Sequence, residues 1–103
     1  MNSEVLILYT RKGCCLCQTL EKKLSNIVLE DLNPSLILSI VDIDSKKVSL
    51  DIQMKYDNEV PVMVLKSSIL SKIIELPRVS PRLKDDMLFS WIQKNLNIFY
   101  KIA

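Results

Sequence analysis

Apolar and polar positions form two kinds of pattern along this chain, and each kind predicts a different element. Predominantly apolar runs at residues 5–9, 36–41 and 60–65 predict strands of a sheet. Because the first two runs do not alternate with polar residues, these strands are expected to be buried on both faces. Residues 16–28 carry apolar side chains at helical spacing, which predicts a helix. It should end before Asn33-Pro34, because the residue before a proline disfavours helical backbone.

The second half of the chain predicts a hairpin followed by a helix. Residues 69–76 are expected to form a fourth strand, which follows the third after a turn at residues 66–68. This connection is too short for a crossover, so the two strands should pair antiparallel. Ser80 as N-cap and Pro81 at the first helical position predict the start of the last helix. Its expected core stripe is Leu83, Met87, Leu88, Trp91, Ile92 and Leu96.

Residues 48–56 fit two different elements. Their apolar side chains alternate strictly, which is typical of a strand, but they also occupy i,i+4 positions on one helical face. Ser45 is a candidate N-cap for a short helix in this region. If the segment is helical, the first half of the chain is a βαβ unit. The whole chain then predicts an α/β fold in the order β-α-β-α-β-β-α, with helices on both faces of a four-stranded mixed sheet.

Composition and charge narrow the class of protein. A chain of 103 residues, of which 49% are hydrophobic and 25% charged, is expected to form one globular domain over residues 1–103. The net charge of +2 is small and evenly scattered, which argues against binding to nucleic acid or to an anionic membrane. Every apolar run is far shorter than the about 20 residues that span a bilayer. The chain starts without a basic segment, so no signal peptide and a cytoplasmic location are expected.

Three cysteines lie within four residues, at Cys14, Cys15 and Cys17. Such a cluster cannot form a disulfide framework, so it indicates a catalytic or a metal-binding site. Cys14 and Cys17 share one face if they open a helix, and a helix N-terminus favours a thiolate. Thiol–disulfide exchange is the preferred interpretation. A metal site needs about four ligands, which one chain without histidine cannot supply but a dimer could.

A Cys-x-x-Cys motif beside a βαβ pattern is the redox signature of the thioredoxin-like fold. More narrowly, the chain resembles the glutaredoxin branch of the thioredoxin superfamily, in particular the short bacterial and plastid-type glutaredoxin-like proteins. The resemblance is carried by LYTRKGCCLC at residues 8–17, VDID at 41–44 and YDNEVPV at 56–62. It covers nearly the whole chain and implies that residues 48–56 are helical.

The resemblance also implies the residues of the site. Cys14 matches the family's nucleophile and Cys17 its resolving thiol, so a dithiol oxidoreductase acting in cell redox homeostasis is expected. Pro61 matches the cis-proline that faces the dithiol, and the backbone of Val60 would pair with a bound peptide or with glutathione. Arg11 matches a basic residue near the glutathione carboxylate and the thiolate.

Some positions depart from the family pattern. Cys15-Leu16 stands where Pro-Tyr is usual, Glu59 stands where a threonine is common, and residues 78–82 replace the Gly-Gly-x-Asp-Asp turn that binds glutathione. These departures weigh against glutathione as the electron donor, although they leave it open. No bound cofactor or metal is expected. Cys15 could be a third redox thiol, but a residue that only fills the place of the proline is the preferred interpretation.

The expected partner is therefore a disulfide-containing protein or a low-molecular-weight thiol, bound by a monomer. The alternative is a non-enzymatic binding module of thioredoxin fold, which would deliver a metal or dock a protein through the cysteine cluster.

Overall fold

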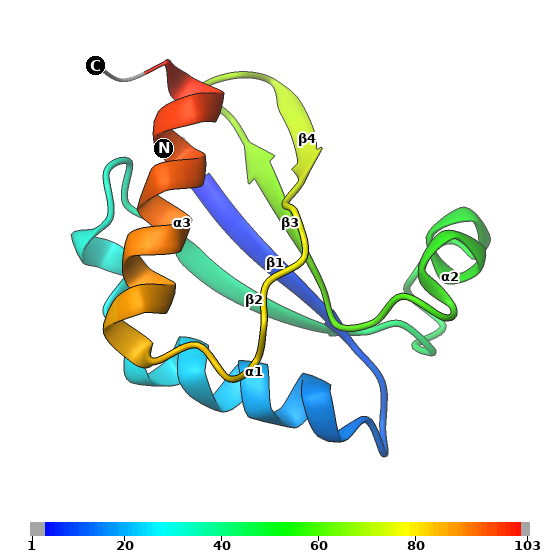
Figure 1. The fold of residues 1–103 in the computed structure, drawn as a ribbon. Coiled ribbons are helices and arrows are strands. Elements are labelled where there is room, and N and C mark those ends of the chain that lie inside the picture. The colour runs from blue at the N-terminus through cyan, green and yellow to red at the C-terminus, as the bar shows by residue number, and fades with distance from the viewer. Residues whose placement is uncertain (1–3, 102–103) are drawn as a thin grey trace.

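The computed structural model describes residues 4–101 and contains one mixed sheet with the strand order β2-β1-β3-β4 (Figure 1). β1 pairs parallel with β2 and antiparallel with β3, and β3 pairs antiparallel with β4. The predicted four-stranded mixed sheet and its antiparallel hairpin are confirmed. The strands are β1 Glu4–Thr10, β2 Ile37–Asp42, β3 Val62–Ser67 and β4 Lys72–Glu75.

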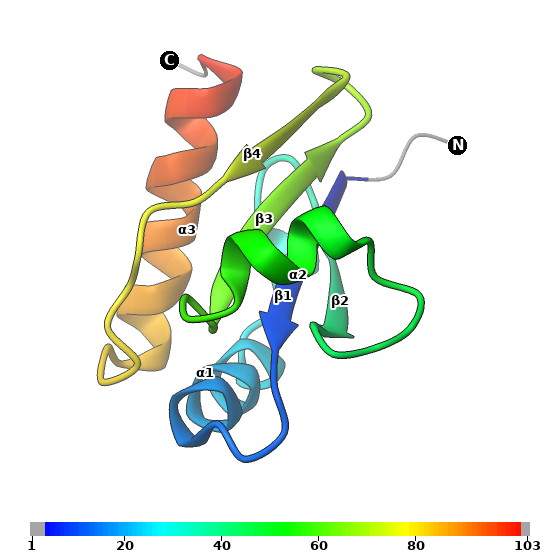
Figure 2. The same ribbon diagram turned by 90° about the vertical axis from the view of Figure 1, so that its right-hand side faces the viewer.

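Three helices cover the two faces of the sheet, as predicted. They are α1 Cys15–Asn26, α2 Leu50–Tyr56 and α3 Asp85–Tyr100, and a short 3-10 turn at Leu29–Asp31 precedes β2. α1 and α3 lie on one face and α2 lies on the other (Figures 1 and 2). The helical interpretation of residues 48–56, which the family resemblance implied, is therefore confirmed.

The two central strands bury side chains on both faces because their residues alternate between two cores. Leu6 and Leu8 of β1 join the larger core, which is shared with α1 and α3. Ile7 and Tyr9 pack against the smaller core, which contains Tyr56 at the end of α2. This double burial explains why the apolar run of β1 does not alternate with polar residues.

β2 departs from the prediction of a strand buried on both faces. It lies at the edge of the sheet, and Ile37 is 57% exposed. Ile40 is also exposed. α2 has only seven residues, so it covers only part of the face on that side. A local apolar run cannot distinguish an edge strand from a central one, because the position of a strand depends on long-range pairing.

Both predicted serine caps were wrong. The Ser45 hydroxyl accepts from Lys47 in a turn, and Ser49 caps α2 by accepting from the Ile52 N–H. Ser80 likewise accepts from the Arg82 N–H in a turn, so the chain does not enter a helix at Pro81. α3 begins later, at Asp85.

The end of α1, the buried stripe of α3 and the hairpin also differ from the prediction. α1 ends at Asn26, and Leu16 and Val28 of its predicted apolar stripe are exposed. Of the stripe predicted for α3, Met87 is exposed while Leu88, Ile92 and Leu96 are buried. The hairpin turn starts later than residue 66, because β3 continues to Ser67 and β4 covers only Lys72–Glu75.

A buried carboxylate connects the start of β1 to the hairpin and to the end of α3. Glu4 is only 4% exposed and accepts from the N–H groups of Ser68 and Ile69 at 2.8 and 3.2 Å. The hydroxyls of Ser67 and Tyr100 also donate to it. Burial raises the pKa of Glu4. The hydrogen bonds together lower it by more than burial raises it, so the pKa lies below its usual value. Burial and the adjacent carboxylate raise the pKa of Tyr100 to about 12.

Replacing Glu4 by alanine is expected to lower the free energy of unfolding by about 1–3 kcal/mol at pH 7, because buried donors lose their acceptor. The folded-state pKa of Glu4 lies below 4.5, so its charge stabilises the fold fully above that pH. The contribution is lost as the pH falls through the folded-state pKa. Urea unfolding of the wild type and of Glu4→Ala, at pH 7 and in acid, measures the difference in the free energy of unfolding. Glu21→Ala, at an exposed position on α1, is the control and should change the free energy of unfolding by less than about 0.5 kcal/mol at pH 7.

Among residues 4–101, no helix is long and apolar enough to cross a membrane.

Candidate functional site

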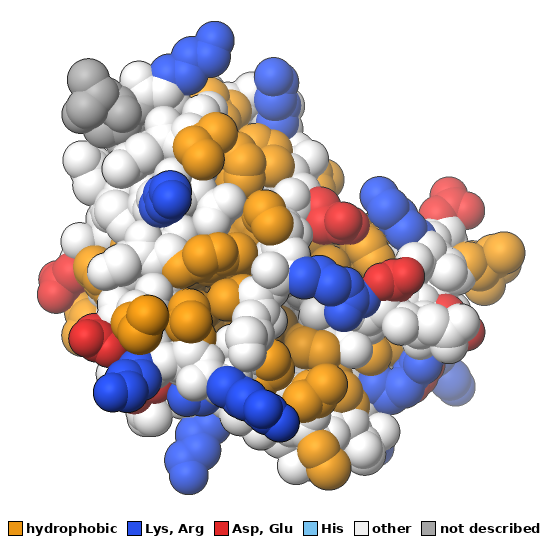
Figure 3. Space-filling model, in the orientation of Figure 1, with side chains coloured by type: hydrophobic (Ala, Val, Ile, Leu, Met, Phe, Trp, Pro, Cys, Tyr) orange, Lys and Arg blue, Asp and Glu red, His pale blue; other side chains and the backbone are white. Residues whose placement is uncertain are grey.

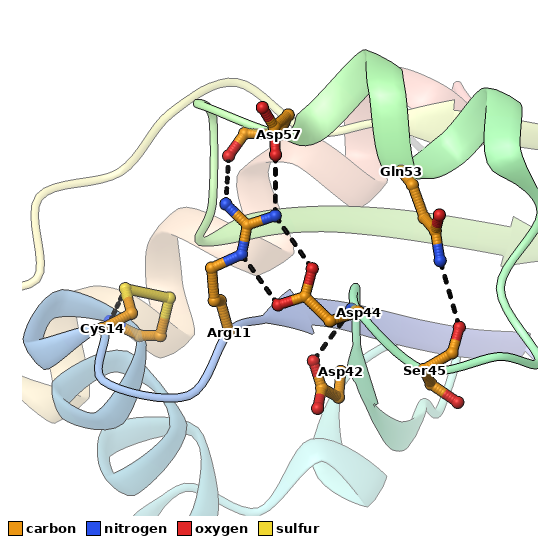
Figure 4. Close-up of polar contacts among 8 residues, drawn as sticks. Arg11, Cys14, Asp42, Asp44, Ser45, Gln53 and Asp57 are labelled. Atoms are coloured by element: carbon orange, nitrogen blue, oxygen red, sulfur yellow. Dashed lines mark hydrogen bonds and ion pairs between the residues drawn. A yellow bond between two sulfur atoms is a disulfide. The ribbon is translucent and has the colours of Figure 1, made fainter.

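A disulfide between Cys14 and Cys17 lies at the N-terminus of α1 (Figure 4). Cys14 is the N-cap of the helix, and its sulfur accepts from the Cys17 N–H at 3.1 Å. Cys14 is half-buried, whereas Cys17 is only 1% exposed. An external reagent therefore reaches Cys14 first, with Cys17 behind it. This geometry fits a nucleophile followed by a resolving thiol, and those roles stay predictions.

The tight turn before Cys14 depends on the only glycine in the chain. The Cys14 N–H donates to the Arg11 carbonyl at 3.2 Å, which closes the turn between β1 and α1. Gly13 adopts φ +80°, a conformation that residues with a Cβ rarely take. The sequence order of strand, glycine and cysteine pair thus sets the first cysteine at the helix start.

Cys15 is the first residue of α1 and carries an exposed free thiol. It has no part in the disulfide, and the preferred interpretation, that Cys15 fills the place of the usual proline, stays a prediction. Among residues 4–101, no group of three or more histidine, cysteine, aspartate or glutamate side chains is placed to hold a metal ion.

The guanidinium of Arg11 lies between two carboxylates, with the disulfide to one side (Figure 4). Its Nε and Nη2 donate to Asp44, both at 3.0 Å. Nη2 also donates to the Asp57 carboxylate at 2.8 Å, and Nη1 donates to the Asp57 carbonyl at 2.6 Å. The hydrogen bonds from Arg11 to Asp44 and Asp57 raise the pKa of Arg11, and the one to Asp44 lowers the pKa of that carboxyl.

These contacts give Arg11 a structural role that the sequence did not predict. Its positive charge is compensated by Asp44 and Asp57, and most of its N–H groups are already donated. The side chain connects the turn before Cys14 to Asp57, which follows α2 and precedes Pro61. The predicted contact of Arg11 with a substrate carboxylate remains a prediction.

Replacing Arg11 by methionine is expected to lower the rate of disulfide exchange, by up to about a hundredfold, because the turn before Cys14 loses its connection to Asp57. The same change leaves the carboxylates of Asp44 and Asp57 without their cation. The rate of thiol release from a small neutral disulfide measures the effect. Lys12→Met, at an exposed position in the same turn, is the control and should stay close to the wild-type rate. An Arg11→Met protein that reacts as fast as Lys12→Met would contradict the structural role of Arg11.

A groove with a volume of about 360 Å³ lies between the start of α1, the end of α2 and the segment after β4. Leu16, which stands between the two cysteines, and Pro61 both line it, so the structure brings the Cys-x-x-Cys segment and Pro61 to one cavity. The Val60–Pro61 peptide bond is cis, as the resemblance implied. On this face of the molecule, apolar side chains gather around a few charged ones (Figure 3).

The charged residues of the groove are largely engaged. Arg78 Nη2 donates to the Glu59 carbonyl at 2.6 Å and also to the Glu59 carboxylate. Burial, followed by the hydrogen bond to Glu75, raises the pKa of the Tyr56 hydroxyl. The Lys55 ammonium lies 5.4 Å from the centre of the Tyr56 ring.

The contacts of Asp44 and Asp57 with Arg11, and the pairing of Arg78 with Glu59, were not predicted from the sequence. Asp44 and Asp57 do occur in the VDID and YDNEVPV segments that carried the resemblance. Their position there was the available signal, but the sequence gives no indication that both contact Arg11.

Comparisons with known proteins agree on family and fold. A family model described as "Glutaredoxin-like domain (DUF836)" matches residues 5–93. A comparison with curated proteins finds none that match. Two similar solved structures are a malarial protein, with TM-score 0.59 and 18% identity over 92% of this chain and 99% of that one, and thioredoxin-2, with TM-score 0.60 and 18% identity over 90% and 84%. The latter is described as a component of the malaria parasite's protein secretion machinery. At these identities the two structures show the fold, which is thioredoxin-like, as predicted.

Proposed function

The chain belongs to the glutaredoxin-like domain family, and on this premise we propose that it is a thiol–disulfide oxidoreductase with a dithiol mechanism. The observation that carries the proposal is the disulfide between half-buried Cys14 and buried Cys17 at the start of a helix. A structural disulfide would not need an accessible sulfur at a helix N-terminus, whereas a nucleophile benefits from both.

The proposed reaction starts from the reduced protein. The Cys14 thiolate attacks one sulfur of a substrate disulfide, forms a mixed disulfide with it and releases the other substrate sulfur as a thiolate. The Cys17 thiolate then attacks the Cys14 sulfur and releases the second substrate thiolate. The Cys14–Cys17 disulfide forms, and two electrons have passed to the substrate. An external thiol donor restores the dithiol by the reverse exchange.

Two features of the site support this order of attack. The Cys17 N–H, which donates to the Cys14 sulfur, would stabilise a thiolate at the same position. The N-terminal end of α1 adds a favourable field for negative charge there. Cys17 lies behind Cys14, where it can attack the Cys14 sulfur but is shielded from solvent.

The proposal includes the partner and the setting. The substrate is a disulfide-containing protein or a low-molecular-weight thiol in its disulfide form, and the backbone of Val60, next to Pro61, pairs with it. The chain acts as a monomer in cell redox homeostasis and holds no bound cofactor. Because the proposed reaction starts from the reduced dithiol, we place the chain in a reducing compartment, the cytoplasm.

A single-turnover experiment tests the function. The protein is reduced, freed of reductant and mixed with bis(2-hydroxyethyl) disulfide, a small neutral substrate. We expect two substrate thiols to be released per chain while the Cys14–Cys17 disulfide forms, as detected by alkylation and peptide mass mapping. Cysteines that stay reduced would contradict the proposal and favour the non-enzymatic binding module.

A further inference from the structure

We propose that the groove beside the disulfide binds an extended peptide of a protein substrate with apolar side chains next to its cysteine, and that it disfavours glutathione. This inference rests on the proposed function, because the groove serves the same disulfide. It concerns which class of disulfide the site prefers.

The shape and lining of the groove fit an apolar peptide. Its volume of about 360 Å³ is at the lower end of the range for ligand sites. Most of its lining is apolar and comes from segments that are distant in the sequence. Leu16 is 58% exposed although it is large and apolar, and it stands between the two cysteines. An apolar side chain beside a substrate cysteine would cover Leu16 and Pro61 and remove both from water.

The charges around the groove do not favour an anionic thiol. The lining contains two basic residues, Lys55 and Arg78, and two acidic residues, Glu59 and Glu75, so their charges cancel. Arg78 is paired with Glu59. Among the lining residues that the structure describes, Lys55 is the one cation without a carboxylate partner. Glutathione carries two carboxylates, so it would find one uncompensated cation here.

Of the two cations that precede Cys14, Lys12 is exposed, whereas Arg11 is neutralised. Arg11 is held by Asp44 and Asp57, so its charge is not available to a substrate carboxylate. An anionic thiol would have to compete with these carboxylates for Arg11 and with Glu59 for Arg78. A peptide with neutral, apolar flanks leaves both pairs intact.

The pair between Glu59 and Arg78 is therefore the specificity determinant in this proposal. Glu59 lies two residues before Pro61, and Arg78 contacts both its carbonyl and its carboxylate. The pair holds Arg78 at the groove and neutralises it. Removing only the acidic partner would keep the contact of Arg78 with the carbonyl of residue 59 and leave the charge of Arg78 uncompensated at the groove, as an anchor for anions.

Rates of exchange with matched disulfides test the proposal. The reduced protein is mixed with glutathione disulfide, with a short peptide disulfide whose cysteine is flanked by leucine, and with the same peptide flanked by aspartate. We expect the leucine peptide to react at least about tenfold faster than the other two, the size of effect that apolar contacts of this kind produce. Equal rates, or a preference for glutathione disulfide, would overturn the proposal.

Variants make the test specific to the groove. Leu16→Ser should remove most of the preference for the leucine peptide, whereas Ile73→Ser, at an exposed position on β4 outside the groove, should leave it unchanged. Glu59→Gln should raise the rate with glutathione disulfide by a few fold. A Glu59→Gln variant with unchanged selectivity, or a loss of preference in Ile73→Ser equal to that in Leu16→Ser, would contradict the assignment.

Bis(2-hydroxyethyl) disulfide separates this inference from the proposed function. It has neither charged nor large apolar flanks, so its reduction reports the Cys14–Cys17 chemistry alone. Reduction of this compound without a preference among the peptides would overturn the groove assignment and leave the oxidoreductase intact. Failure to reduce it at all would overturn both.

Discussion

Replacing Cys14 by serine is expected to lower the rate of disulfide exchange by a factor on the order of 10³ or more, because the attacking group is lost. A serine hydroxyl is not ionised near neutral pH and does not form a bond to the substrate sulfur. Cys14 is the N-cap of α1, and serine is also a good N-cap residue, so the fold should be retained. Release of thiol from bis(2-hydroxyethyl) disulfide measures the loss, and circular dichroism checks the fold.

The two other cysteines provide matched comparisons for this result. Cys17→Ser keeps the nucleophile but cannot resolve the mixed disulfide, so we expect a covalent adduct on Cys14 that mass spectrometry detects. Cys15→Ser should leave the exchange rate nearly unchanged, because its exposed thiol lies outside the disulfide. A Cys14→Ser protein that retains the wild-type rate, or an adduct that forms on Cys15 instead, would contradict the assignment of the nucleophile.

Truncating Leu24 to alanine is expected to lower the free energy of unfolding by about 2–5 kcal/mol, the range for a fully buried leucine. Leu24 is 1% exposed and belongs to the core between α1, α3 and the sheet. Its removal leaves a cavity under the helix that carries both cysteines. Urea unfolding monitored by Trp91 fluorescence measures the change.

The control for Leu24 is Met54→Ala, which shortens an exposed side chain on α2. It should change the free energy of unfolding by less than about 0.5 kcal/mol. Equal stability of the two variants would contradict the packing of α1 against the larger core. If Leu24→Ala were folded but slow in exchange, the position of α1 would be shown to matter for the site.

Elements that are specified locally could be predicted from the sequence. The apolar run of β1, the glycine turn and the cysteine pair follow one another directly, so both the strand and the start of α1 were evident. The edge position of β2 could not be predicted, because its neighbours in the sheet are decided by contacts with distant segments. Ser45 and Ser80 show the same limit for caps, since a serine hydroxyl that caps a helix can equally accept from the backbone of a turn.

The same distinction between local and long-range information applies to the candidate site. Cys14, Cys17 and Pro61 were identified because each occurs in a short motif. The environment of Arg11 could not be inferred, because Asp44 and Asp57 lie 33 and 46 residues away from it in the sequence. The groove was missed for a related reason: its lining comes from several segments, and only their packing brings them together.

Equilibration of the protein in a series of dithiol–disulfide redox buffers tests the central claim most directly. The account predicts one reversible two-electron transition, in which Cys14 and Cys17 pass together from alkylatable thiols to a disulfide while Cys15 stays alkylatable throughout. A pair that never forms the disulfide, or one that strong reductants cannot open in the folded protein, would contradict it.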